Sequence, residues 1–202
     1  MGASKVGGKE LRILNAGMRR FARSGYAHVT MADIAAEANT SEAGLYHSFS
    51  TKENVLSAVL QREQERCLGK IEEVLRENVS AAQKLRKFVE ERLRHSQTLS
   101  KFGTLSADPF ITSRPPLRNL FHNFEEKERQ LMEKIIEEGV AAGEFAPTLD
   151  RRTPQVLLSV LQGLRLRTVH ASGANWEERG RRRQKTEVMF ATELFIRGIG
   201  AP

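Results

Sequence analysis

The sequence predicts an all-α protein of about nine helices, with an N-terminal helix-turn-helix domain of three helices and a larger helical domain after it. Apolar residues recur at helical spacing, as at Leu11, Leu14, Met18 and Phe21. Hydrophobic residues make up 40% of the 202 residues, which is enough for a core, whereas aromatic residues make up only 6%. Strand-rich proteins need more turn residues and more β-branched residues. The composition therefore favours helices.

Charge and cysteine content limit the classes of function. The net charge of +7 indicates an anionic partner, but residues 1–54 carry seven basic and five acidic residues, so charge alone does not locate the binding site. The single Cys67 cannot form an internal disulfide, which is typical of a reducing cytosol. No apolar run approaches the length of a membrane helix. We expect a cytoplasmic protein that binds no membrane.

Two short helices around a tight turn are the most informative feature. Thr30 and Asp33 form a pair like a capping box at the start of the first, and Ser41 is a good N-cap for the second. Asn39 stands where glycine is usual in such a turn, because Asn tolerates positive φ. The pattern is typical of a helix-turn-helix, whose second helix enters the major groove of DNA.

Gly44 and Lys52 are unusual as purely structural residues. Gly44 weakens a short helix, which suits a helix that fits into a groove or, alternatively, a poorly optimised linker helix. Ser50 and Glu53 predict a capping box for a fourth helix that extends toward Arg76. Lys52 lies in its first turn, where the helix dipole disfavours a cation. Either a DNA phosphate offsets that cost, or Lys52 is a solvated lysine.

Apolar stripes predict further helices around residues 85–93, 117–140, 150–170 and 188–199, with an irregular stretch over 99–116 and Gly143 as the end of a helix. The helix after Asp150 is apolar around most of its circumference, so it must be covered on two sides. A second subunit is one way to cover it, and a central place in a monomeric core is the other. The expected dimer interface comprises Val156, Leu157, Val160, Leu161, Leu164, Phe190, Leu194 and Phe195.

From Leu11 to Val59 the chain resembles the TetR family of bacterial regulators. This stretch is about a quarter of the chain, and the rest fits the family only by its layout of helices. The sequence departs from the family pattern around Asn39 and at Ser48, so the operator sequence cannot be carried over. The matching positions include Ala16, Phe21, Gly25, Thr30, Ile34, Ala35, Ala38, Ser41, Leu45, Tyr46, Phe49, Lys52 and Leu56.

The resemblance implies roles for individual residues at a DNA interface. DNA phosphates would be held by Thr30, Tyr46, His47 and Lys52, and the groove would be faced by Ser41, Ala43 and Gly44. Thr40 and Glu42 are also expected to bind DNA. Glu42 can accept a hydrogen bond from cytosine N4 or repel a phosphate. Two alternatives stay open at this point. His47 could instead be a buried histidine beside Phe49, and the Tyr46 ring could pack while its hydroxyl reaches outward.

The resemblance also implies a division of the chain. We expect a flexible tail over residues 1–8, a DNA-binding domain over 9–52 with the helix-turn-helix at about 30–49, and an effector-binding and dimerisation domain over 53–202. The expected effector is a partly apolar small molecule. Its candidate pocket residues are Phe88, Arg92, Phe102, Phe110, Phe121, Phe124 and Met132.

These features predict a homodimeric transcriptional regulator that binds a two-fold operator in double-stranded DNA and is associated with the nucleoid when bound. A repressor released by its effector is the leading hypothesis, and a sequence-indifferent nucleoid protein of the same fold is the alternative. The sequence has no Gly-rich phosphate loop, nucleophile elbow or metal-ligand motif, so we expect no enzyme, cofactor or metal. A lone Cys67 is a poor candidate for a thiol sensor. The basic run over 179–185 is expected to be a solvated helix face or a loop.

Overall fold

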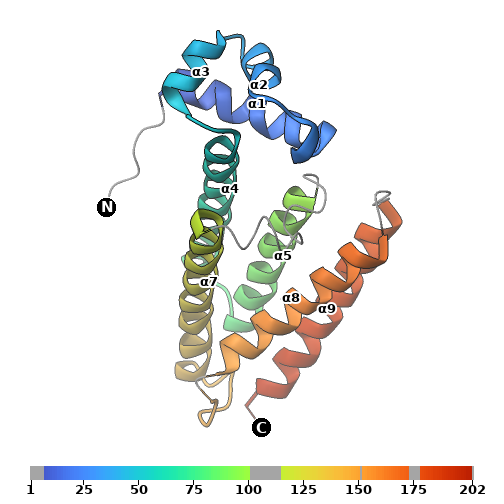
Figure 1. The fold of residues 1–202 in the computed structure, drawn as a ribbon. Coiled ribbons are helices and arrows are strands. Elements are labelled where there is room, and N and C mark those ends of the chain that lie inside the picture. The colour runs from blue at the N-terminus through green and yellow to red at the C-terminus, as the bar shows by residue number, and fades with distance from the viewer. Residues whose placement is uncertain (1–6, 101–114, 151, 173–177, 202) are drawn as a thin grey trace. The chain divides into compact units, whose positions relative to one another are not determined.

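The computed structural model describes residues 7–100, 115–150, 152–172 and 178–201. Over these residues it contains eight α-helices, one 3-10 turn and no strand, which confirms the all-α prediction (Figure 1). The described chain divides into two compact units. The first comprises residues 1–64 and 99–120, and the second comprises 65–98 and 121–202. The domain boundaries predicted from the sequence stay a prediction.

The first unit is built from α1 (Gly8–Ser24), the 3-10 turn η1 (Tyr26–His28), α2 (Met31–Glu37), α3 (Glu42–Ser48) and the start of α4 (Lys52–Leu75). The helix α1 begins at Gly8, inside the tail expected over residues 1–8, and residues 1–6 lie outside the described residues. Gly25 ends α1 as expected, with φ 74° and its N–H bonded to the Phe21 carbonyl at 3.0 Å.

A close approach between α1 and α4 holds the first unit together. A Cβ on Gly17 would lie 2.9 Å from Cγ1 of Val55, so only glycine lets the two helices meet at this distance. Arg62 on α4 donates a hydrogen bond to Oδ1 of Asn15 at 2.8 Å. The fully buried apolar side chains of this unit include Ile13, Phe21, Ile34, Leu45, Leu56 and Val59.

The second unit contains the rest of α4 together with α5 (Ala81–Ser100), α7 (Pro115–Ala141), α8 (Thr153–Ser172) and α9 (Glu178–Ile199), with the ends of α5 and α7 assigned to the first unit. The helix α8 packs along α9 (Figure 1). The prediction of an irregular stretch over 99–116 is wrong at both of its ends, because α5 continues to Ser100 and α7 begins at Pro115, a residue suited to a first helical turn. Its remainder lies outside the described residues.

The turn after α7 fixes several helices of the second unit. Gly143, at φ 72°, ends the helix as predicted, and Phe145 then packs so tightly on Gly139 that a Cβ there would lie 2.2 Å from the Phe145 ring. Glu144 accepts hydrogen bonds from the first N–H groups of α5, at 3.0 Å from Ala81 and 3.1 Å from Ala82. Phe145 also forms an antiparallel bridge with Gly200.

Candidate nucleic-acid interface

The turn between α2 and α3 has the predicted backbone geometry. Asn39 has φ 52° and is the one non-glycine residue with positive φ among the described residues. The Thr40 N–H bonds to the Ala35 carbonyl at 3.0 Å, which closes the turn behind α2. The left-handed conformation reverses the chain within a few residues, so that α3 starts at a new angle. The prediction for Asn39 is confirmed.

Both predicted caps around this turn are present. The Thr30 hydroxyl accepts from the Asp33 N–H at 3.1 Å, and Asp33 Oδ2 accepts from the Thr30 N–H at 2.9 Å, which completes a capping box. The Thr30 hydroxyl also donates to Asp33 Oδ2 at 2.7 Å, and these bonds lower the pKa of Asp33. Ser41 Oγ accepts from the Gly44 N–H at 3.1 Å. A phosphate would have to compete with Asp33 for the Thr30 proton.

The helix α3 buries one side chain and exposes most of the others. Leu45 is fully buried, whereas the side chains of Ser41, Glu42, Ala43, Tyr46 and His47 are exposed. The exposed fraction of Tyr46 is 49%, which is high for a large ring. The alternative that His47 is buried beside Phe49 is therefore wrong. Exposure leaves this face free to meet a partner, but the DNA roles of these residues stay predictions.

Gly44 has a structural reason that the sequence did not reveal. A Cβ at this position would lie 2.9 Å from Oγ1 of Thr40 and 3.2 Å from Nζ of Lys9. The missing side chain thus makes room for a threonine hydroxyl and for an ammonium from the first turn of α1. Thr40 and Gly44 are both partly buried by this packing.

Lys52 is held inside the first unit. Its Nζ donates to the carbonyl of Tyr26 at 2.9 Å and to that of Val29 at 2.8 Å, and it lies 4.4 Å from the centre of the Tyr26 ring (Lys52 is partly buried). Desolvation by this burial lowers the pKa of Lys52. The alternative of a solvated lysine is therefore wrong. These contacts explain why a lysine is tolerated in the first turn of α4.

The cap of α4 differs from the prediction. Oγ1 of Thr51 accepts from the Asn54 N–H at 3.1 Å, and α4 begins at Lys52, so Thr51 is the N-cap. Ser50 Oγ instead accepts from the Asn54 side chain at 2.9 Å. The predicted Ser50–Glu53 capping box is wrong by one residue, because two adjacent hydroxyl residues precede the helix and either can satisfy the pattern.

Two residues of this region, Lys9 and Tyr26, were missed in the sequence. Lys9 lies against a residue of α3, and Tyr26 contacts a lysine 26 positions later in the chain. No local spacing links such distant positions, so only the tertiary packing reveals them.

The residues predicted to line an effector pocket do not lie together in one cavity. The side chains of Phe88, Phe124 and Met132 belong to its buried core, Phe121 is partly exposed, and Phe102 and Phe110 lie outside the described residues. Only Arg92 lines a large cavity, of about 540 Å³. The prediction confused core with pocket, because both produce apolar residues at helical spacing. The other residues that line this cavity are His122, Glu125, Glu126, Glu128, Gln155, Leu158, Ser159, Gln162 and Gly163.

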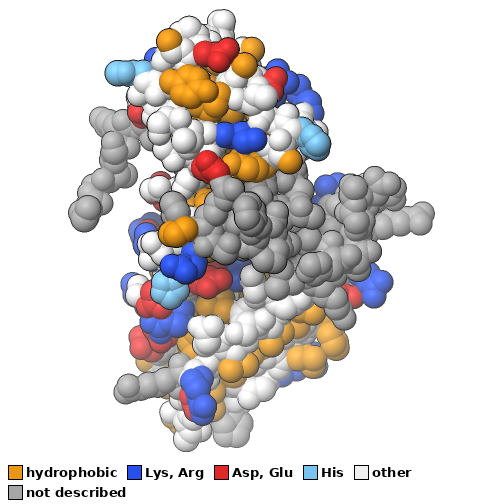
Figure 2. All heavy atoms as spheres, in the orientation of Figure 1, with side chains coloured by type: hydrophobic (Ala, Val, Ile, Leu, Met, Phe, Trp, Pro, Cys, Tyr) orange, Lys and Arg blue, Asp and Glu red, His pale blue; other side chains and the backbone are white. Residues whose placement is uncertain are grey.

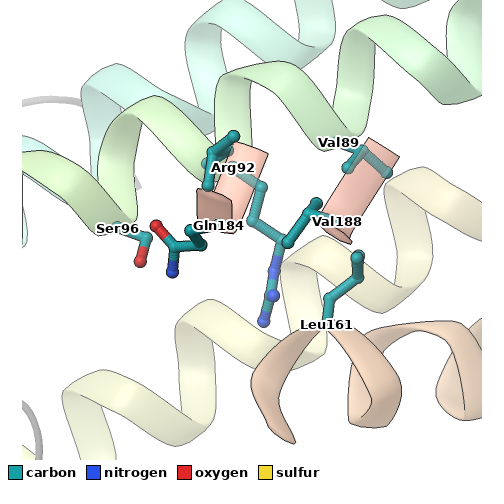
Figure 3. A pocket seen from close by; sticks show the side chains of 7 residues that line it. Val89, Arg92, Ser96, Leu161, Gln184 and Val188 are labelled. Carbon is teal, nitrogen blue, oxygen red and sulfur yellow. The ribbon is translucent and has the colours of Figure 1, made fainter. Parts of the chain in front are cut away.

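A buried ion pair lies at this cavity. Arg92 Nε donates to Glu128 Oε1 at 2.8 Å, and the exposed fractions of the two side chains are 13% and 1%. Arg92 also borders a second cavity of about 20 Å³, roughly the room for one water molecule. Figure 3 shows Arg92 and Ser96 from α5 beside Gln184 from α9. Gln184 is buried, and its Oε1 accepts no hydrogen bond from the described residues.

Other candidate chemistries lack a site in the described residues. Burial raises the pKa of the Cys67 thiol to about 12, so the thiol is protonated at neutral pH and is a poor nucleophile. No group of three His, Cys, Asp or Glu side chains is placed there to hold a metal ion. None of the described helices is long and apolar enough to cross a bilayer.

The predicted dimer residues divide between the two sides of α8 and α9. Leu157 and Leu161 face the core, and Leu164 and Phe195 are partly buried. Val156, Val160, Phe190 and Leu194 are exposed, with exposed fractions of 44–64%. Figure 2 shows a band of hydrophobic side chains along α8. Of the basic run, Arg182, Arg183 and Lys185 lie on an exposed face of α9.

The tight turn at Asn39 and the exposed helix after it define a helix-turn-helix DNA-binding protein with a second helical unit. Residues 13–59 match the family model described as bacterial regulatory proteins, tetR family. Over these residues the chain is similar to that family of bacterial regulatory proteins, and a transcriptional regulator of known structure is similar to it over 96% of its length.

Individual proteins are similar to this chain over most of its length. A transcriptional regulator from Cytophaga hutchinsonii has a TM-score of 0.88 and 26% identity, over 96% of this chain and 100% of that chain. The transcriptional regulator FadR from Bacillus subtilis, in complex with stearoyl-CoA, has a TM-score of 0.71 and 20% identity, over 94% of this chain and 98% of that chain. The repressor KstR2 from Mycolicibacterium smegmatis is 28% identical over 141 residues. That alignment covers 64% of this chain and 64% of the repressor.

Proposed function

We propose that this chain is a homodimeric repressor that binds a two-fold operator through α3 and is released from it by a small molecule. The observation that carries this proposal is the exposed face of α3 behind the Asn39 turn, which leaves Ser41, Ala43 and Tyr46 open to a partner. A helix presented in this way fits the major groove of DNA, and residues beside it reach the phosphates. The KstR2 relative is a repressor, which favours repression here.

The dimer is supported by the apolar surface of α8 and α9. Val160 and Phe190 expose 44% and 64% of their area, and large apolar side chains on neighbouring helices favour association. Two copies related by a two-fold axis would place two recognition helices on a palindrome, one helical turn or a multiple of it apart.

The effector site is supported by the cavity at Arg92. Its volume of about 540 Å³ is suitable for a small molecule. Leu158 is the one apolar side chain among the residues that line it, so we expect the effector to carry polar groups as well as the apolar part predicted from the sequence. A ligand that binds the DNA-incompetent state more tightly, by a few kcal/mol, would release the operator.

Selection of bound sites from a random pool of duplexes tests the proposal. We expect enrichment of one palindrome, with an affinity at least ~10³-fold above that of random DNA at the same salt concentration. Equal affinity for all sequences would instead indicate the sequence-indifferent nucleoid protein. The same selection repeated with cell extract should lose the enrichment if the extract contains the effector.

A further inference from the structure

We propose that Lys9, whose ammonium lies beside the recognition helix α3, contacts a DNA phosphate. Lys52 instead positions the helix-turn-helix through contacts within the protein. This inference rests on the proposed function, since it assumes that α3 enters the major groove. The family resemblance assigned Lys52 to the DNA phosphates, and here Lys9 takes that role.

The ammonium of Lys52 already has hydrogen-bond partners within the protein. An ammonium has three N–H donors, and the carbonyls of Tyr26 and Val29 accept two of them at 2.9 and 2.8 Å. The Tyr26 ring lies 4.4 Å from the same nitrogen. A phosphate could take only the third N–H without breaking these contacts, which connect the first turn of α4 to η1 and to the residue that follows it.

The hydrogen bonds of Lys52 join the two ends of the helix-turn-helix. Lys52 follows α3 by only four residues, and Tyr26 and Val29 lie between α1 and α2. The two hydrogen bonds therefore close a loop of chain that contains the whole helix-turn-helix. Closing that loop restricts the angle between α3 and the other helices of the first unit. Lys52 is a positioning residue in this arrangement.

The ammonium of Lys9 lies beside α3. A Cβ on Gly44 would lie only 3.2 Å from its Nζ, so the ammonium lies against the middle of α3. A helix with its side chains, about 10–12 Å across, fills a major groove of about 12 Å, so phosphates line both of its sides. A cation that touches the flank of α3 is therefore close to a phosphate when the helix is in the groove.

The electrostatic environment of Lys9 also favours a phosphate. Among the described residues, no carboxylate forms an ion pair with this ammonium. Lys9 also lies in the first turn of α1, where the helix dipole disfavours a cation. A DNA phosphate would offset that cost and would displace condensed counterions from the DNA, which makes the contact measurable as a salt dependence.

The test measures the dissociation constant of a selected duplex as a function of KCl concentration, for Lys9→Met, Lys52→Met and Lys70→Met. Lys70 is an exposed residue of α4 in the second unit and serves as the matched control. Lys9→Met should reduce the slope of log K against log salt by about 0.9 per protomer. Lys52→Met should weaken binding at every salt concentration and leave the slope unchanged, and Lys70→Met should change neither.

An unchanged slope in Lys9→Met would overturn the inference, as would a loss of about 0.9 in a folded Lys52→Met. If Lys52→Met fails to fold by circular dichroism, Lys52→Arg replaces it, because this variant keeps the charge but its planar guanidinium cannot take the place of a compact ammonium between the two carbonyls. It should weaken binding with the slope of the unmodified protein, and full affinity in a folded Lys52→Arg would contradict the positioning role. Failure of the unmodified protein to bind any duplex would reject the proposed function itself.

Discussion

Asn39 shows how one backbone conformation determines the geometry of the DNA-binding unit. Its φ of 52° lies in the left-handed region, which costs most residues about 1–2 kcal/mol. Asn reduces this cost because its short polar side chain can bond locally, and Gly avoids it altogether. The turn therefore restricts which residues this position accepts, although the Asn39 side chain is exposed.

Replacement of Asn39 should separate conformational strain from side-chain contact. Asn39→Gly should leave the free energy of unfolding within about 0.5 kcal/mol of the original, since Gly adopts positive φ freely. Asn39→Val should lower it by about 1–2 kcal/mol or more, because a β-branched residue is strained there. Urea denaturation followed by circular dichroism measures both. Equal stability of the two variants would show that this turn relaxes to another conformation.

At the level of elements, the start of α5 depends on a residue far away in the sequence. Glu144, in the turn after α7, accepts from the N–H groups of Ala81 and Ala82 with its two carboxylate oxygens. A carboxylate at this end also interacts favourably with the helix dipole. A capping residue normally precedes its own helix, so this cap is a tertiary contact across 63 positions.

Removal of the Glu144 carboxylate should destabilise the second unit. Glu144→Ala leaves two N–H groups of α5 without their acceptors and should cost about 1–2 kcal/mol of unfolding free energy. Glu144→Gln keeps one acceptor oxygen and should cost less. Glu137→Ala, at an exposed position of α7, is the control for loss of an acidic side chain. A Glu144→Ala variant as stable as this control would exclude a capping role.

Caps formed by residues close in the sequence could be predicted from it, whereas caps formed by distant residues could not. Thr30 and Ser41 were identified correctly because their partners lie three residues away, within a pattern that sequence spacing records. The cap by Glu144 and the contacts of Lys52 join distant positions, so no local pattern encodes them. The effector residues failed for a related reason, since an apolar stripe at helical spacing describes Phe88 in a core as well as a residue in a pocket.

At the level of the whole molecule, surface chemistry differs between neighbouring faces of the second unit. The cavity at Arg92 is lined mainly by polar side chains, whereas Val156, Val160, Phe190 and Leu194 present apolar area on α8 and α9. An apolar surface of this kind on adjacent helices is typical of subunit interfaces.

The helix α4 contributes residues to both compact units, so the chain passes directly from one to the other within a helix.

Charges placed on the apolar surface should separate the subunits. We expect the double variant Val160→Glu and Phe190→Glu to have the monomer mass of 22.7 kDa in light scattering, and the unmodified protein to have twice that mass. Burying an unpaired carboxylate in an interface costs several kcal/mol, which exceeds what a modest interface tolerates. Ala141→Glu, at an exposed end of α7, should remain dimeric. A dimer that survives both glutamates would place the interface elsewhere.

The turn over residues 144–146 also limits how the second unit can deform. Its Glu144 side chain holds the start of α5, its Phe145 packs on α7, and its backbone bonds to the end of α9, at 2.8 Å from the Ala146 N–H to the Ile199 carbonyl and 3.0 Å from the Ala201 N–H to the Glu144 carbonyl. These helices therefore share a common pivot. Unless those bonds break, α5 and α9 can separate only at the ends that lie away from this turn, which are the end of α5 and the start of α9.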